Sequence, residues 1–431
     1  RMYNKLTLSS KKVINGWCMY DWANSVYSLV ITTAIFPIYF NSVTTSLDGS
    51  YIVSFFGIQI VNSVLYSYSL SFSFLLLTII QPILSGIADY VGRKKLFLKI
   101  FMYLGSASCI SLYFFDGSNI EFGIICSVLA SLGFSGSLVF YNAFLPEIVS
   151  RDKFDRVSAR GFSFGYLGSV ILLIICLVLI TFYDFFGFSN SALATRFTFL
   201  LVGIWWIVFS QITFITVPEV IKNKKLSFSI LSYGTNELIK VWNYLKNVRN
   251  LKLFLFSFFF YSMGVQTVML IASYFGDKEL NLDQNKLILT VLIIQIVAIF
   301  GAYFFAYISK YKGNKFSLII MNILWIIICI SAYFIQDENQ FYLLATTVGL
   351  VMGGIQSLSR STFSKLIPIE IKDNASFFNF YAISYNMSVV LGTFSYGYIE
   401  QITGSMRIST LVLASYFLIG LVILLFVKIR K

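Results

Sequence analysis

The chain has 431 residues, of which 58% are hydrophobic and 12% are charged, and its formal net charge is +13. A soluble protein of this length needs a charged exterior. The composition therefore excludes a soluble protein and indicates a chain that folds in lipid. There is no histidine, and the sequence has no CxxC spacing and no P-loop motif. We therefore expect no enzymatic activity, no metal and no cofactor, and we attribute the positive charge to membrane lipids rather than nucleic acid.

Twelve apolar runs are each long enough to cross a hydrocarbon core of ~30 Å. In lipid a backbone amide must be satisfied within its own segment, so each run is predicted to be a helix. The apolar stretch 51–62 is assigned to the loop beside the second span. The predicted spans are 17–42, 63–88, 96–115, 122–142, 161–183, 197–217, 251–275, 287–309, 316–335, 341–362, 376–399 and 408–427.

The first span contains Asp21, the only carboxylate that we place inside a span rather than at its edge. An ionisable group there is costly and indicates a function. Asn24 lies three residues on, on the same helical face, and Tyr27 is a further binding candidate in this span. Asp21 could bind a proton or a substrate ammonium group. Alternatively, it pairs with Arg160 or Arg360, which the predicted topology places near the same membrane surface.

The turn after the second span, residues 86–95, reads GIADYVGRKK. Gly92 permits a tight turn between antiparallel helices. Asp89 can face a helix N-terminus or an arginine, and Arg93 can pair with a carboxylate. We predict a latch that stabilises the state closed toward the cytoplasm; the alternative is an ordinary basic loop. Asn142, at the end of the fourth span, is a further gating candidate.

The longest hydrophilic segment, 218–250, divides the chain into an N-terminal six-helix bundle at 1–217 and a C-terminal one at 251–431. Its later part, 235–249, is predicted to be an amphipathic helix that lies on the membrane and tethers the bundles. Beyond it, five uncharged polar side chains at mid-depth each need a partner in lipid. They suit a cavity for a small polar or zwitterionic solute, or else they bond between helices: Gln266, Gln295, Gln356, Tyr385 and Asn386.

The two bundles look related. The glycines of the turns after spans two and eight match at an offset of 221, and Pro146 and Pro368 match at an offset of 222. Six spans separate each pair, so the repeat is parallel rather than inverted. Of the 32 Lys and Arg residues, 28 lie on the side that carries the termini, which predicts that both termini are cytoplasmic.

Four motifs sharpen this interpretation. The turn at 86–95 resembles the loop 2–3 motif of the major facilitator superfamily, although Ser85 stands where that motif has glycine. The segments 17–25 (WCMYDWANS), 140–147 (FYNAFLPE) and 353–361 (GGIQSLSRS) resemble the vacuole-effluxer-like branch. The resemblance covers essentially the whole chain. It implies an all-α membrane protein with the major facilitator fold and an association with amino-acid transport.

We therefore expect a secondary transporter that moves a small polar solute, with amino acids favoured by the resemblance, by alternating access about a midplane site. Protons could be the coupling ion. We expect a monomer in contact with membrane lipids, located in the plasma (inner) membrane. The alternatives are a transporter of lipids or other amphiphiles and a non-transporting membrane receptor or scaffold on the same fold.

Overall fold

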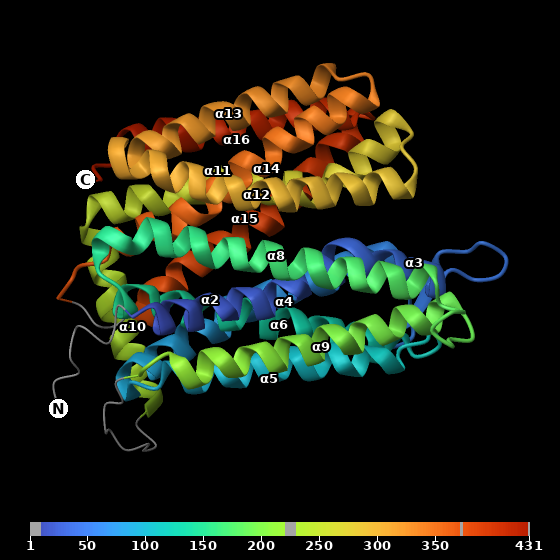
Figure 1. Ribbon diagram of the computed structural model, residues 1–431, viewed down its shortest axis with the longest axis horizontal. Helices are drawn as coiled ribbons and strands as arrows, with labels where there is room; N and C mark the ends of the chain where they lie inside the picture. The colour runs from blue at the N-terminus through green and yellow to red at the C-terminus, as the bar shows by residue number, and fades with distance from the viewer. Residues whose placement is uncertain (1–9, 220–229, 371–373, 430–431) are drawn as a thin grey trace.

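The computed structural model describes residues 10–219, 230–370 and 374–429. Within these ranges, twelve long helical segments run along the molecule (Figure 1). The first six are the composite segment Lys11–Thr44, α4 (Asn62–Val91), α5 (Lys94–Ser111), α6 (Ile120–Ala143), α8 (Phe154–Thr181) and α9 (Ser191–Thr216). The second six are α11 (Arg249–Leu280), α12 (Gln284–Lys312), α13 (Asn314–Phe334), α14 (Glu338–Leu366), α15 (Asn374–Thr403) and α16 (Met406–Leu425).

The twelve predicted spans match these segments in order. Of the helices in the described part of the chain, eleven are long and apolar enough to cross a membrane by length and composition alone. The twelfth, α15, is more polar and carries Asn374, Asn379 and Asn386 among its buried residues. Several helices extend beyond their predicted ends; α8, for example, begins at Phe154 rather than near 161.

The first span is not one regular helix. It consists of α2 (Lys11–Val26), a π-helical segment η1 (Tyr27–Ile35) and α3 (Phe36–Thr44). Pro37 lies in the first turn of α3. The widened π turns, which the sequence did not reveal, precede the proline; such segments are frequent at functional sites.

The loop that follows forms a small hairpin. Strands β1 (Ile52–Phe55) and β2 (Ile58–Val61) pair antiparallel, with Ile52 opposite Val61. The two turn residues, Phe56 and Gly57, both have positive φ, as the tightest hairpin turns require. The hairpin is anchored where the amide of Phe56 donates to the Glu121 carboxylate at 3.0 Å.

The spans separate into two bundles, the first half (α2–α9) and the second half (α11–α16), which lie side by side in Figure 1. Helices within a half pack closely where glycines face each other or a backbone. Gly105 of α5 faces Gly133 of α6, and Gly353 of α14 lies against the Ala298 carbonyl of α12. The halves meet where α4 and α6 contact α15, and where α8 contacts α12 and α14.

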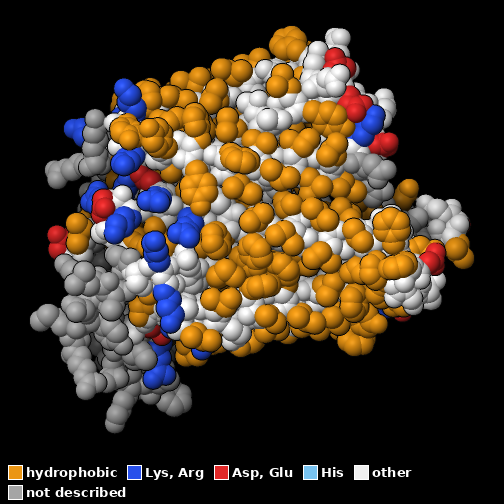
Figure 2. Space-filling model, viewed as in Figure 1, with side chains coloured by type: hydrophobic (Ala, Val, Ile, Leu, Met, Phe, Trp, Pro, Cys, Tyr) orange, Lys and Arg blue, Asp and Glu red, His pale blue; other side chains and the backbone are white. Residues whose placement is uncertain are grey.

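Charged side chains gather at the ends of the molecule, and an apolar band covers its middle (Figure 2). Lys and Arg are concentrated at the end that carries the label α10 in Figure 1. We call this the basic end and the opposite one the outer end.

Helix α10 (Ile230–Asn247) lies at the basic end, within the predicted linker; residues 220–229 of that linker are outside the described residues. Val241 and Leu245 are buried, whereas Trp242 is 55% exposed.

Candidate functional site

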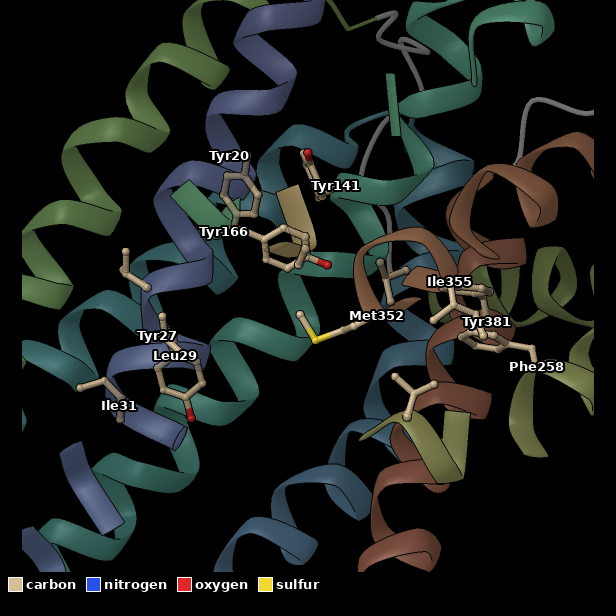
Figure 3. Packing of buried hydrophobic residues seen from close by; sticks show 14 of the residues in the cluster. Tyr20, Tyr27, Leu29, Ile31, Tyr141, Tyr166, Phe258, Met352, Ile355 and Tyr381 are labelled. Atoms are coloured by element: carbon tan, nitrogen blue, oxygen red, sulfur yellow. The ribbon is translucent and has the colours of Figure 1, made fainter. Parts of the chain in front are cut away.

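A large cavity lies between the two halves. It runs from the buried side chains of Asp21 and Arg360 toward the outer end, past Thr33 and Val291, and contains about 1490 Å³ of empty space that is partly continuous with the exterior. Figure 3 shows buried side chains beside it, with Tyr166 from the first half and Phe258, Ile355 and Tyr381 from the second.

The base of the cavity is an ion pair that joins the halves. The Arg360 guanidinium donates through Nη1 to Asp21 Oδ2 at 3.2 Å, and Tyr141 donates to the same oxygen at 2.9 Å. Arg360 also donates to Oγ and the carbonyl oxygen of Ser158 at 3.0 and 2.9 Å, and to Asn142 Oδ1 at 3.3 Å. With 5% of Asp21 and 2% of Arg360 exposed, the pair is almost fully removed from solvent.

Aromatic rings enclose the guanidinium. Its central carbon lies 4.1 Å from the Phe162 ring centre, 4.8 Å from Trp17 and 5.6 Å from Tyr141. A Cβ at Gly161 would come within 2.9 Å of both Asp21 Oδ2 and Arg360 Nη2, so glycine is what lets α8 approach the pair. Electrostatic attraction between a cation and ring faces adds to the ion pair in such a desolvated setting.

Of the two arginines that the sequence offers as partners for Asp21, the structure pairs only one with it. Arg360 pairs with it, whereas Arg160 lies half-buried with its guanidinium 5.7 Å from the Phe164 ring. Asn142 contacts the pair through Arg360, so three of the expected gating residues meet at one place.

At mid-depth the cavity is lined by uncharged polar groups. Tyr385 donates to Gln266 Oε1 at 3.0 Å, and Tyr166 of the first half donates to Gln356 Oε1 of the second. Gln356 Nε2 contacts only the Met269 sulfur, at 3.6 Å. Gln295 and Asn386 also line the cavity.

Asn24 and Tyr27 behave differently, although both were expected to bind substrate. Asn24 lines the cavity, is 1% exposed, and its Nδ2 has no hydrogen-bond partner in the structure. Tyr27 is buried inside the first half against Phe134 and Trp206. It is not among the residues that line the cavity. Tyr27 lies six residues after Asp21, which places it about 120° around the helix from the face that carries Asp21.

A second junction joins the halves at the turn after α4. Gly92 ends that helix in the left-handed conformation, with φ 72°, as the tight turn requires. The Asp89 carboxylate accepts from the backbone amides of Ala375 and Ser376, at 3.2 and 2.7 Å, at the start of α15. The cation at this junction is not the one that we expected. Lys94 Nζ lies 3.6 Å from Asp89 Oδ1, whereas Arg93 is exposed.

Lys94 also contacts Glu147, which in turn accepts from Asn374 Nδ2 at 3.1 Å. The difference from the expectation has a simple cause. Lys94 is the first residue of α5 and is buried against the junction, whereas Arg93 lies outside that helix.

A third junction was missed from the sequence. Asp155 of α8 accepts from Ser309 Oγ, Asn314 Nδ2 and Lys365 Nζ at 2.7, 2.8 and 2.7 Å, and all three donors belong to the second half. The predicted start of the fifth span near residue 161 left Asp155 in a loop. The turn after span eight, matched to 86–95 by the repeat, was the signal that could have located it.

Comparison with solved structures identifies the fold. The chain superposes on FucP, a major facilitator superfamily transporter, in its outward conformation with a TM-score of 0.71 at 12% identity, covering 99% of this chain and 100% of that one. It superposes on a bacterial homologue of the iron transporter ferroportin, in an outward-facing state, with a TM-score of 0.69 at 13% identity, covering 96% and 98%. The protein has the major facilitator fold, a multi-pass membrane architecture of two parallel six-helix repeats.

Sequence comparison gives the family. The family model described as "Vacuole effluxer Atg22 like" matches residues 9–431. The chain is 32% identical over 417 residues to the uncharacterized MFS-type transporter YxiO of Bacillus subtilis, covering 96% of this chain and 94% of that protein. It is 23% identical to autophagy-related protein 22-1 of Aspergillus niger, covering 98% and 89%. The chain belongs to the vacuole effluxer Atg22-like family, and family and fold together make it a membrane transporter.

Proposed function

We propose that the protein is a secondary transporter that carries a small polar solute by alternating access, with its basic end facing the cytoplasm and the plasma membrane as its location. The excess of Lys and Arg at that end supports this orientation. The three junctions then hold the cytoplasmic side closed while the cavity extends toward the outer side.

The Asp21–Arg360 pair carries this proposal. It lies at the base of the cavity, contains one charge of each sign, and links the two halves. A zwitterionic solute that reaches it can offer a carboxylate to Arg360 and an ammonium group to Asp21. These contacts would replace the ion pair that joins the halves, so binding would favour opening at the basic end. Amino acids meet this requirement and are favoured by family membership.

The mid-depth amides would position the rest of the solute. Asn24 Nδ2 is buried without a partner, and Gln356 Nε2 has only a weak sulfur contact. A buried donor without a partner is costly, so a solute that accepts from these groups gains affinity.

Proton coupling would rest on Asp21. Protonation neutralises its carboxylate, weakens the attraction to Arg360 and leaves the arginine able to bind a solute anion. Replacing Asp21 with Asn should then abolish accumulation driven by a pH gradient in proteoliposomes while sparing counterflow. Accumulation that survives in this variant contradicts coupling through Asp21.

The direct test is a thermal-shift screen of purified protein against amino acids, dipeptides, sugars and nucleosides, followed by uptake of any stabilising compound into proteoliposomes. We expect a zwitterionic compound to stabilise the wild type and to lose most of that effect in an Arg360→Lys variant, which keeps the charge but loses the planar donor fork. Stabilisation by none of these compounds, or stabilisation without uptake, contradicts the proposal.

A transporter of amphiphiles is the second candidate. The cavity wall also contains Leu29, Val265, Met269 and Met352, which offer an apolar surface beside the polar groups. Lysophospholipids and fatty acids should therefore be included in the same screen. Stabilisation by these compounds alone would favour the amphiphile transporter, and stabilisation by a compound that is never transported would favour a receptor.

A further inference from the structure

Helix α10 packs against the first half immediately beside the Asp89 junction. Gly234 of α10 and Gly86 of α4 are in backbone contact: a Cβ at Gly86 would lie 2.1 Å from the Gly234 carbonyl oxygen. A Cβ at Gly234 would lie 2.7 Å from Ile87 Cγ1. Gly86 and Ile87 lie three and two residues before Asp89 in the same helix, so α10 crosses α4 within one turn of the junction.

The later part of α10 contacts the second half, again beside the junction. Trp242 packs on Phe380 of α15 with ring centres 5.6 Å apart, and Tyr244 meets Phe377 edge-on at 5.7 Å. Phe377 directly follows Ser376, whose amide donates to Asp89.

We propose that α10 is a strap that holds the basic end closed, fastened to α4 by its glycine contact and to α15 by Trp242 and Tyr244. The inference rests on the proposed alternating access, because it assigns α10 a role in one state of that cycle. Helix α10 is separated from α11 by Val248 alone, so the chain joins it to the second half while its closest backbone contact is with the first. When α4 and α15 separate, α10 cannot keep both contacts.

The strap differs in kind from the three junctions. The junctions are charged or strongly polar contacts, whereas the strap is held by rings and by close backbone packing. Each ring pair contributes a modest stabilisation, worth roughly a two- to tenfold change in the open population, so losing both contacts should raise that population roughly 5- to 100-fold. Docking or release of α10 would therefore shift the equilibrium between the closed and the open basic end without any change in the cavity.

The test measures opening at the basic end directly. Ser376 is fully buried in the closed junction and its Oγ has no partner in the structure, so Ser376→Cys gives a nearly isosteric thiol that opening would expose. The five native cysteines are all buried and supply the background, which is measured in the parent chain. The readout is the rate at which a membrane-impermeant maleimide, applied from the basic side of oriented vesicles, labels this thiol.

Trp242→Ala combined with Tyr244→Ala should speed labelling roughly 5- to 100-fold. Ile239→Ala, at an exposed position on the same helix, is the matched control and should change nothing. Trp242→Phe alone keeps a ring against Phe380, so its thiol should be labelled almost as slowly as that of the parent chain. Gly234→Leu should speed labelling, because the larger side chain displaces α10 from α4. Equal rates in the double variant and the Ile239→Ala control overturn the strap.

The readout needs no substrate, so the two proposals can fail separately. Asp89→Asn removes a charge from the junction itself and should speed labelling whether or not the strap exists. If Asp89→Asn speeds labelling and the strap variants do not, only the strap is wrong. If no variant exposes Ser376→Cys, the basic end does not open and alternating access itself is contradicted.

Discussion

The basic end and the middle of the cavity contain buried polar groups in very different arrangements. At the basic end, Asp155 has three donors within 2.8 Å, and Asp89 has two backbone amides and a lysine. At mid-depth, two tyrosines bond two glutamines, and Asn24 Nδ2 is left without a partner. Satisfied groups stabilise one state of a protein, whereas buried groups without partners favour a ligand that completes them.

The sign of the charges at the basic end adds to this contrast. In the described part of the chain, Asp21 and Asp155 of the first half pair with Arg360 and Lys365 of the second, whereas Asp89 and Glu147 share Lys94 of their own half. At the Asp21 and Asp155 junctions the charges of the two halves are complementary, so these surfaces attract when closed and are separately hydrated when apart. A solute in the middle has no such network to disrupt until it reaches Asp21.

The largest expected effect comes from breaking the Asp21–Arg360 pair on one side. Arg360→Met leaves an uncompensated buried carboxylate and should lower the free energy of unfolding by about 3–5 kcal/mol. A thermal melt in detergent measures it. Combining Arg360→Met with Asp21→Asn should recover much of the loss, because no charge is then buried alone. Equal stability of the single variant and the wild type would mean that the pair is solvated.

The next largest effect is expected at the third junction, where Asp155 of the first half binds Lys365 of the second. Asp155→Asn keeps the shape but removes the charge that pairs with Lys365, and it should favour the open basic end by about 1–3 kcal/mol. The labelling rate of Ser376→Cys measures it. Asp152→Asn is the matched control, because Asp152 is an exposed acid three residues earlier. A similar rate in both variants would remove Asp155 from the gate.

A smaller effect is expected in the cavity. Gln356→Ala and Asn386→Ala should each weaken binding of the stabilising solute about tenfold, or about 1.4 kcal/mol, with expression and melting temperature preserved. Isothermal titration of the purified variants checks this. Tyr27→Phe serves as the control, since Tyr27 packs away from the cavity. Unchanged affinity in both glutamine and asparagine variants would exclude these two residues from the site.

The smallest effect separates two neighbouring cations. Arg93→Gln removes an exposed charge and should change the stability by less than about 0.5 kcal/mol. Lys94→Gln removes a buried cation between Asp89 and Glu147 and should cost several times more. Thermal melts of the two variants check the difference. A larger loss for Arg93→Gln would show that the sequence-based assignment to Arg93 was right.

The sequence predicted the fold well because lipid imposes simple rules. Apolar length gave the spans, and the two offsets gave the parallel repeat. Asp21 was found because a carboxylate inside a span is rare, and its partner was narrowed to two arginines by topology alone. Choosing Arg360 over Arg160 required the packing of Trp17, Phe162 and Gly161, which no local pattern contains.

The remaining misses have similar causes. Asp155 was placed in a loop because span ends are the least certain feature of an apolar run. Lys94 and Arg93 are adjacent in sequence, and only the start of α5 decides which one is buried. Tyr27 was assigned to the cavity because it lies in the same span as Asp21, but it is about 120° around the helix from Asp21 and packs inside the first half instead.

The central claim is that solute binding opens the basic end while it closes the outer one. Its most direct test compares two thiols, Ser28→Cys in the half-buried cavity wall and Ser376→Cys in the junction, each labelled from its own side of the membrane. The account predicts that the transported solute slows labelling of the first and speeds labelling of the second. Rates that change in the same direction, or that do not respond to a solute that is transported, would contradict it.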